Sequence, residues 1–181
     1  MKPVEVISDR KALCRAIYEV CYLTGHYKLR SGQTSTEYFD KYRFESQPSI
    51  LKSVAKHLAP LIPSDTEVLA GLEMGGIPIA TALSMETGLP VVFVRKKAKD
   101  YGTEKFAEGY DVKNKKVLIV EDVVTTGGQI LLSTADLRGL GAEVLNAVCV
   151  IQRGQDLSKF KESNLNLISL FTMDELKGSK K

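Results

Sequence analysis

The sequence predicts an α/β protein with a doubly wound, mainly parallel sheet flanked by helices and a small N-terminal hood, in a single domain of residues 1–181. Three observations carry this prediction. Short apolar runs rich in β-branched residues recur after residue 67, with lengths typical of strands buried on both faces. Helix-like segments alternate with these runs, as they do in parallel sheets. Residues 24–47 are instead polar, aromatic and Gly/Ser-containing, which favours a hood of short strands and loops.

The N-terminal part begins with an amphipathic helix predicted over residues 10–23. Its apolar residues recur at steps of three and four: Leu13, Ala16, Ile17, Val20 and Leu23. We expect Gly25 to end this helix, because glycine commonly follows the last helical residue. A second helix is predicted over residues 48–59, where Pro48 lies near the first turn and lacks only an N–H that would be unpaired there.

The core of the domain, about residues 48–172, contains the predicted sheet. Its strands are expected at five apolar runs: residues 68–72, 91–94, 117–120, 144–151 and 165–170. Helices are predicted over residues 78–87 and 128–140, with Pro78 at the first helical position. In open α/β sheets, ligands bind beyond the carboxyl ends of the strands. We therefore expect the functional residues in the segments that follow the strands.

The composition excludes several classes of protein. Apolar residues make up 44% and charged residues 26%, as in ordinary globular proteins, and no apolar run approaches the roughly 18–20 residues of a membrane span. No apolar signal segment lies in residues 1–10, so we expect a cytoplasmic protein with no membrane partner. A net charge of +3 does not by itself indicate nucleic acid, and residues 177–181 are set aside as a frayed tail.

The cysteine content also fits a cytoplasmic protein. The count is odd and no Cys-x-x-Cys pair occurs, so we expect buried free thiols at Cys14, Cys21 and Cys149. With only two histidines in the chain, a zinc site is not expected.

The most informative segment is residues 117–129, VLIVEDVVTTGGQ, in which a buried strand ends in Glu121 and Asp122. A Thr-Thr-Gly-Gly turn then opens a helix, and its glycines, helix N–H groups and hydroxyls suit a phosphate. The carboxylates would repel a phosphate, but they can accept hydrogen bonds from ribose hydroxyls or hold a divalent cation. The alternative is that they cap the helix or pair with lysines. No P-loop and no dinucleotide-binding motif occurs.

This segment resembles the motif of type I phosphoribosyltransferases that binds 5-phosphoribosyl-1-diphosphate (PRPP). The resemblance implies the fold of that family, a loop that wraps the 5′-phosphate, and an acid pair that contacts the ribose hydroxyls. It assigns PRPP binding to one continuous stretch: Glu121, Asp122, Val123, Val124, Thr125, Thr126, Gly127, Gly128 and Gln129. Asp122 is also expected among the catalytic residues.

A second glycine turn follows the first strand of the core. Taken alone, its Gly-Gly-Ile-Pro sequence is equally typical of a plain strand-to-helix turn. The resemblance implies that this turn holds the diphosphate, with contacts from Glu73, Met74 and Gly75. A Tyr-Lys pair is familiar there in some relatives, and in its absence backbone N–H groups remain available as donors.

A basic segment, RKKAKDYGT, follows the second strand from Arg95. It can be a solvated charge run, but cations at this edge would also stabilise the negative charge that develops on a diphosphate leaving group. The segment resembles the catalytic loop of orotate phosphoribosyltransferases. The resemblance implies that Arg95, Lys96 and Lys99 are catalytic and bind PRPP, together with Tyr101. It also implies a homodimer, because such loops reach into the partner's active site.

Two segments resemble the base-binding parts of the same enzymes. In the hood, Arg30 stands where a Lys is common, and we expect it to contact PRPP, whereas Tyr38 and Phe39 are expected to line orotate. Arg153 follows a long strand and can bind the carboxylate of orotate with its fork of donors, with Thr125 nearby. The alternatives are ordinary aromatic packing in the hood and an exposed arginine in a turn.

The order of these motifs resembles orotate phosphoribosyltransferases from about residue 10 to residue 172. The resemblance implies transfer of ribose 5-phosphate from PRPP to N1 of orotate, giving orotidine 5′-monophosphate and diphosphate. Mg²⁺ is the implied cofactor, held mainly by substrate oxygens and water, with Glu121 and Asp122 as candidate ligands. Two alternatives are a phosphoribosyltransferase for another base and a PRPP-sensing regulator. The regulator would bind nucleic acid, and we expect no nucleic-acid partner.

Overall fold

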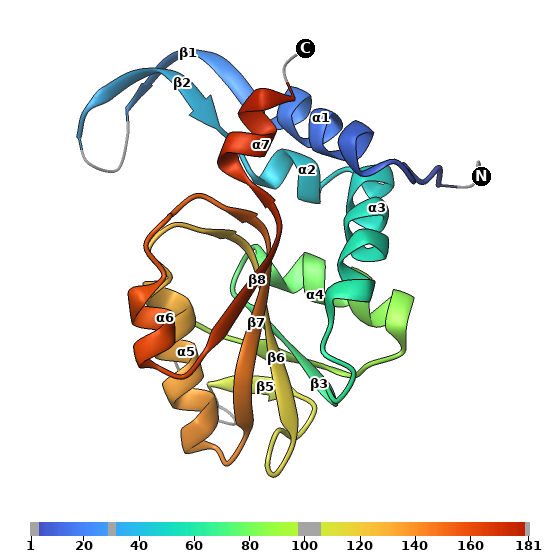
Figure 1. The fold of residues 1–181 in the computed structure, drawn as a ribbon, viewed down its shortest axis with the longest axis vertical. Helices are drawn as coiled ribbons and strands as arrows, with labels where there is room; N and C mark the ends of the chain where they lie inside the picture. The colour runs from blue at the N-terminus through green and yellow to red at the C-terminus, as the bar shows by residue number, and fades with distance from the viewer. Residues whose placement is uncertain (1–3, 29–31, 98–105, 180–181) are drawn as a thin grey trace.

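A six-stranded sheet forms the centre of the computed structural model, which describes residues 4–28, 32–97 and 106–179 (Figure 1). The strands lie in the order β5-β4-β3-β6-β7-β8, and all neighbours are parallel except β4 and β5. Their bounds are β3 (Val68–Leu72), β4 (Val91–Val94), β5 (Ala107–Gly109), β6 (Lys116–Val124), β7 (Glu143–Gln152) and β8 (Asn166–Thr172). The predicted fold class is therefore confirmed, while β5 was not predicted.

Helices cover both faces of this sheet, as a doubly wound fold requires (Figure 1). The helices of the two layers are α1 (Arg10–Cys21), α3 (Pro48–Leu58) and α4 (Gly76–Thr87) on one face, and α5 (Gly128–Gly139) and α6 (Ser158–Glu162) on the other. Successive residues of a strand point to opposite faces. Leu118 and Val120 accordingly belong to the first core, and Val117 and Ile119 to the second.

The hood is an antiparallel hairpin of β1 (Tyr22–Lys28) and β2 (Thr34–Phe39), followed by the short α2 (Tyr42–Glu45). The first helix was predicted to run to residue 23, but it ends at Cys21 because Tyr22 pairs with Phe39 across the hairpin. Gly25 consequently lies inside β1 and does not end the helix, so that expectation is wrong. A pattern of apolar residues cannot separate a helix from a strand that continues its last turn.

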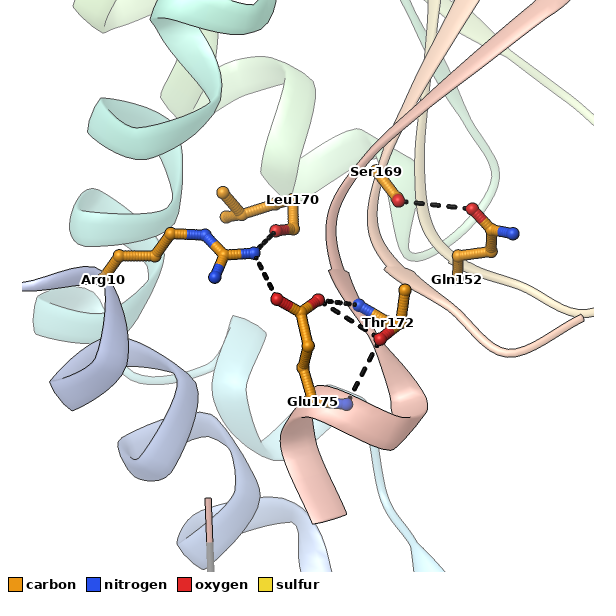
Figure 2. Close-up of polar contacts among 6 residues, drawn as sticks. All are labelled: Arg10, Gln152, Ser169, Leu170, Thr172 and Glu175. Atoms are coloured by element: carbon orange, nitrogen blue, oxygen red, sulfur yellow. Dashed lines mark hydrogen bonds and ion pairs between the residues drawn. The ribbon is translucent and has the colours of Figure 1, made fainter. Parts of the chain in front are cut away.

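The C-terminal segment is an ordered helix, α7 (Met173–Gly178), preceded by a capping box between Thr172 and Glu175. Arg10 of α1 donates hydrogen bonds to the Leu170 carbonyl at 2.6 Å and to Glu175 at 2.9 Å, which docks α7 against α1 (Figure 2). The guanidinium also lies 4.6 Å above the centre of the Phe171 ring. The expectation of a frayed tail from residue 177 is therefore wrong for Lys177 and Gly178, because the cap and Arg10 stabilise the helix that contains them.

Smaller differences concern the starts of elements. Helix α3 begins at Pro48 as predicted, whereas α4 begins at Gly76, two residues before Pro78, which still lies in the first turn where its missing N–H breaks no intrahelical bond. A 3₁₀ turn, η1 (Ala59–Leu61), extends α3. The three cysteines are buried free thiols, as predicted. Within the described residues, no helix has the length and apolar character that a membrane crossing needs.

Candidate active site

The acid pair lies inside β6, since this strand pairs with β7 as far as Val124. The prediction that the strand ends before Glu121 is therefore wrong, and both acids are buried, with exposed fractions of 9% for Glu121 and 0% for Asp122. The turn that follows is open to solvent at Thr125 and Thr126. The sequence placed the acids beyond the strand because it could not show how far the ladder with β7 continues.

The turn after β6 is shaped for an anion at the N-terminus of α5. Gly127 is the N-cap with φ 71°, a backbone conformation that disfavours other residues, and a Cβ there would lie 2.2 Å from the Phe160 ring. No side chain of the described residues caps α5, so the N–H groups of its first turn have no capping side-chain acceptor. A Cβ at Gly128 would meet only the Thr126 hydroxyl, at 3.8 Å, which leaves the mouth of the turn unobstructed. Such a terminus favours a bound phosphate.

A lysine of the hood closes over the acid pair. Lys41 Nζ lies 2.6 Å from Asp122 Oδ2, while the other Asp122 oxygen accepts a hydrogen bond from the Val123 N–H. The Glu121 carboxylate accepts a hydrogen bond from the Asp122 N–H at 2.9 Å. Glu45 of α2 is also buried, and its Oε1 has no hydrogen-bond partner among the described residues. Three carboxyl groups and one ammonium thus share a buried site that links the hood to the sheet.

The protonation of this cluster follows from burial and mutual repulsion. Burial, reinforced by interaction with Asp122, raises the pKa of Glu45 to about 9 and the pKa of Glu121 to about 9. Burial acts in the same direction on Asp122, but hydrogen bonds from Glu121 and Glu45 and the charge of Lys41 outweigh it and lower its pKa. At neutral pH, Asp122 is therefore the ionised member, paired with the ammonium.

The second glycine turn packs tightly against this acid. A Cβ at Gly75 would lie 1.6 Å from Asp122 Oδ2, and a Cβ at Gly76 would lie 2.3 Å from the Val120 carbonyl oxygen. Both glycines therefore permit close approach to β6, a requirement of packing that the sequence argument did not foresee. The preceding Glu73–Met74 peptide bond is cis, and the Met74 side chain is exposed.

The start of the basic segment lies beside the second glycine turn. The Lys96 N–H donates to the Glu73 carboxylate at 3.3 Å, and the Arg95 N–H donates to the Phe106 carbonyl at 3.0 Å. Arg95 is half-buried and Lys96 is exposed. Three of the expected site residues lie outside the described residues: Lys99, Tyr101 and Arg30.

Three of the four residues expected to bind the base, Tyr38, Phe39 and Arg153, line one cavity, whereas Thr125 is not among its lining residues. This cavity, of about 240 Å³, lies between the hood, the end of β7 and α7. It is lined by Tyr18, Tyr22, Ser35, Glu37, Tyr38, Phe39, Arg153, Met173 and Lys177. The Arg153 N–H donates to the Val124 carbonyl at 2.8 Å, and a Cβ at Gly154 would lie 1.9 Å from the Thr125 carbonyl oxygen. The turn that carries Arg153 is therefore packed against the turn after β6.

Comparison with known proteins identifies the family. Residues 43–173 match the phosphoribosyl transferase domain. An orotate phosphoribosyltransferase of Nocardioides sp. is 54% identical over 141 residues, which cover 78% of this chain and 79% of the relative. This chain belongs to the orotate phosphoribosyltransferase family. Another member, from Methanocella arvoryzae, is 42% identical over 86% of this chain and 90% of its own length.

Solved structures of orotate phosphoribosyltransferases share the fold. The enzyme of Mycobacterium tuberculosis in complex with Fe(III) dicitrate superposes with a TM-score of 0.83 at 27% identity, covering 92% of this chain and 98% of the neighbour. The same enzyme in complex with PRPP gives a TM-score of 0.79 at 25% identity, covering 93% and 98%. The sheet and its hood are thus those of the orotate phosphoribosyltransferase family.

Several residues at this site were not found by sequence reasoning. Lys41 and Glu45 lie in a hood that carries no phosphate-binding pattern, and only the packing of α2 against the sheet brings them to Asp122. Lys177 was set aside with the tail, although a Thr-x-x-Glu capping signature precedes it and could have indicated an ordered helix.

Proposed function

We propose that this chain is an orotate phosphoribosyltransferase that transfers the 5-phosphoribosyl group of PRPP to N1 of orotate and releases diphosphate. One observation carries the proposal: an uncapped helix N-terminus, a buried acid pair and a cationic aromatic cavity adjoin one another in a chain 54% identical to an enzyme of that name. An anion site beside a pocket for a flat acidic ring matches the two substrates.

Positions along the sheet edge supply the parts that PRPP needs. Residues 125–129 would bind the 5′-phosphate through the first N–H groups of α5 and the threonine hydroxyls. Glu121 and Asp122 would orient the ribose, which requires Lys41 to turn aside, since Asp122 is enclosed by that side chain. The diphosphate would lie between residues 73–75 and the start of the basic segment, because Glu73 and Lys96 join these two loops.

The reaction is a displacement at C1 of the ribose, in which the N1–C1 bond forms and the bond from C1 to the diphosphate oxygen breaks. The chain needs no covalent nucleophile for this step, so positioning and charge stabilisation are its contributions. Arg95 and Lys96, with Lys99 and Tyr101, would stabilise negative charge on the leaving diphosphate, and Arg30 would add a further cation. Arg153 would hold the carboxylate of orotate, with Tyr38 and Phe39 against its ring.

The residues present fit Mg²⁺ that is held mainly by substrate and water. No group of three or more His, Cys, Asp or Glu side chains among the described residues is placed to hold a metal ion, and Asp122 is paired with Lys41. Glu45 Oε1, which has no hydrogen-bond partner among the described residues, nevertheless lies in the same cluster as the acid pair, and these carboxyl oxygens are the ligand type that Mg²⁺ prefers. When bound, Mg²⁺ would neutralise the diphosphate, with Glu121 and Asp122 as candidate ligands. A homodimer with shared active sites remains part of the proposal.

A base panel tests the assignment directly. The purified chain is incubated with PRPP, Mg²⁺ and either orotate, uracil, adenine or hypoxanthine, and loss of each base is followed. We expect PRPP-dependent consumption of orotate and much slower consumption of the other bases. Preference for another base would reject the assignment. Binding of PRPP without turnover of any base would favour a regulator.

A second test replaces Lys99 with Ala. Turnover of orotate should fall strongly, while the free energy of unfolding should change little.

A further inference from the structure

Two cations of the base cavity have no anionic partner within the described part of the chain. Neither Arg153 nor Lys177 forms an ion pair there, and the only acid among the described lining residues is Glu37. That acid is engaged, since a hydrogen bond to Glu37 raises the pKa of Tyr22 to about 12. The cavity therefore offers two positive groups to a ligand. Sequence analysis assigned a role to Arg153 but not to Lys177.

Polar contacts anchor the segments that carry the two cations, and Figure 2 shows those made by Gln152 and by Glu175. Residue 153 directly follows Gln152, whose amide accepts from the Ser169 hydroxyl at 3.2 Å and donates to the Gly154 carbonyl at 2.9 Å. Lys177 belongs to α7, which the capping box and the Arg10–Glu175 contact of 2.9 Å fix against β8 and α1. A charged group on an anchored segment can select a ligand, because the backbone that carries it need not be ordered when the ligand binds.

The shape of the cavity indicates which anion it accepts. Its walls include four aromatic rings and Met173, and the rings of Tyr18 and Tyr22 stack at 4.9 Å between centroids. Such walls suit a flat ring with a small charged substituent and not a phosphate, whose oxygens would need donors on several sides. In the function proposed above, the phosphates of PRPP bind elsewhere, at α5 and the basic segment.

We propose that Lys177 is a specificity-determining residue that provides, with Arg153, the second cation for the carboxylate of the acidic pyrimidine. The proposal rests on the function proposed above and adds a part of the chain, α7, to its base site. Arg153 supplies a planar fork, whereas Lys177 supplies a compact charge that can approach from a different direction. Together they favour orotate over a neutral pyrimidine such as uracil, which lacks the carboxylate.

The test compares Lys177→Met with Lys177→Arg and with a matched control, Lys161→Met, an exposed lysine of α6 on another part of the surface. Steady-state kinetics would give kcat and the KM for orotate and for PRPP, and competition would give the affinity for uracil. For Lys177→Met we expect the KM for orotate to rise about 10-fold, as for loss of one well-placed charge contact, with the KM for PRPP and the uracil affinity unchanged. Lys177→Arg should restore most of the orotate affinity, and Lys161→Met should behave as wild type.

The outcomes separate this inference from the function on which it rests. If wild type consumes orotate but Lys177→Met leaves its KM unchanged, the role of Lys177 is refuted and the enzyme assignment stands. An equal loss of affinity for orotate and uracil, or a parallel fall in Tm, would also refute it, because either result indicates a structural role. If wild type consumes no orotate, the assignment itself fails.

Discussion

Replacing Lys41 with Met should destabilise the protein by leaving Asp122 ionised and unpaired. The Asp122 side chain has no exposure, and the Lys41 side chain is 33% exposed, with 2.6 Å between Nζ and Oδ2. Removing one partner costs about 3–5 kcal/mol for a fully buried pair and about 0–1 kcal/mol for a surface pair. A lysine that is one-third exposed lies between these limits, so we expect a loss of about 2–3 kcal/mol.

Protonation of Asp122 does not remove this cost. With an ordinary Asp pKa of about 3.9, taking up a proton at pH 7 costs about 4 kcal/mol, which exceeds the expected loss from the unpaired charge. In Lys41→Met, Asp122 should therefore stay ionised, and the free energy of unfolding should fall. For a chain of this size, a loss of about 2–3 kcal/mol lowers Tm by about 4–12 °C.

Urea unfolding and calorimetry of four proteins would measure the effect: wild type, Lys41→Met, Asp122→Asn and the double variant. A double-mutant cycle isolates the pair, because Asp122→Asn removes the charge that Lys41 neutralises. The double variant should be more stable than the sum of the single losses predicts. Arg43→Met, at an exposed residue of α2, the short helix that follows Lys41, serves as control. Additive losses, or wild-type stability in Lys41→Met, would refute the reasoning.

Three further predictions concern other parts of the site. Gly75→Ala should lower both stability and activity, since its Cβ would lie 1.6 Å from Asp122 Oδ2, whereas Gly139→Ala has no atom within 4 Å and should leave calorimetric Tm nearly unchanged. Partial burial raises the pKa of Glu175, but hydrogen bonds from its cap residue and from α1 lower it overall. Its contribution to stability should therefore be present above about pH 4.3 and be lost as pH falls through its lowered folded-state pKa, so the difference between Glu175→Gln and wild type in urea unfolding should shrink as pH is lowered from 7 to below 4.3. Arg153→Ala should raise the KM for orotate about 10- to 100-fold in steady-state assays, as expected for loss of a charge-assisted hydrogen bond. An unchanged KM would contradict its assigned role.

The strands and helices of the core could be predicted because their signals are local. A run such as Val117 to Val120 is buried on both faces, so every residue is apolar and the strand is visible in the sequence alone. The ends of elements depended on partners instead. The pairing of Val124 with Gln152 extends β6 past the acid pair, and the pairing of Tyr22 with Phe39 ends α1 early. Neither partner is near in sequence, so no local pattern could reveal it.

The turn after β6 could be predicted in the same way, since its glycines, threonines and helix start are consecutive in the chain. The partners of Asp122 could not be predicted from the sequence. Lys41 lies 81 positions before Asp122 and reaches its carboxylate only after the hood folds onto the sheet. This separation also explains why pairing with a lysine was left open as an alternative for the acid pair. Burial makes an ionised Asp122 without a partner energetically unfavourable, and Lys41 of the hood supplies the cation that stabilises it.

Under the proposed function, the two interpretations of Asp122, pairing with a lysine and contacting ribose, are compatible as successive states of one carboxylate. A fully enclosed Asp122 cannot accept from a ribose hydroxyl while Lys41 covers it, and leaving the carboxylate without a cation costs about 2–3 kcal/mol. The ammonium must therefore be replaced by groups that satisfy the same oxygen, such as hydroxyl donors or a hydrated cation. Because Lys41 lies between β2 and α2, the same part of the chain carries Tyr38, Phe39 and the cation that pairs with Asp122.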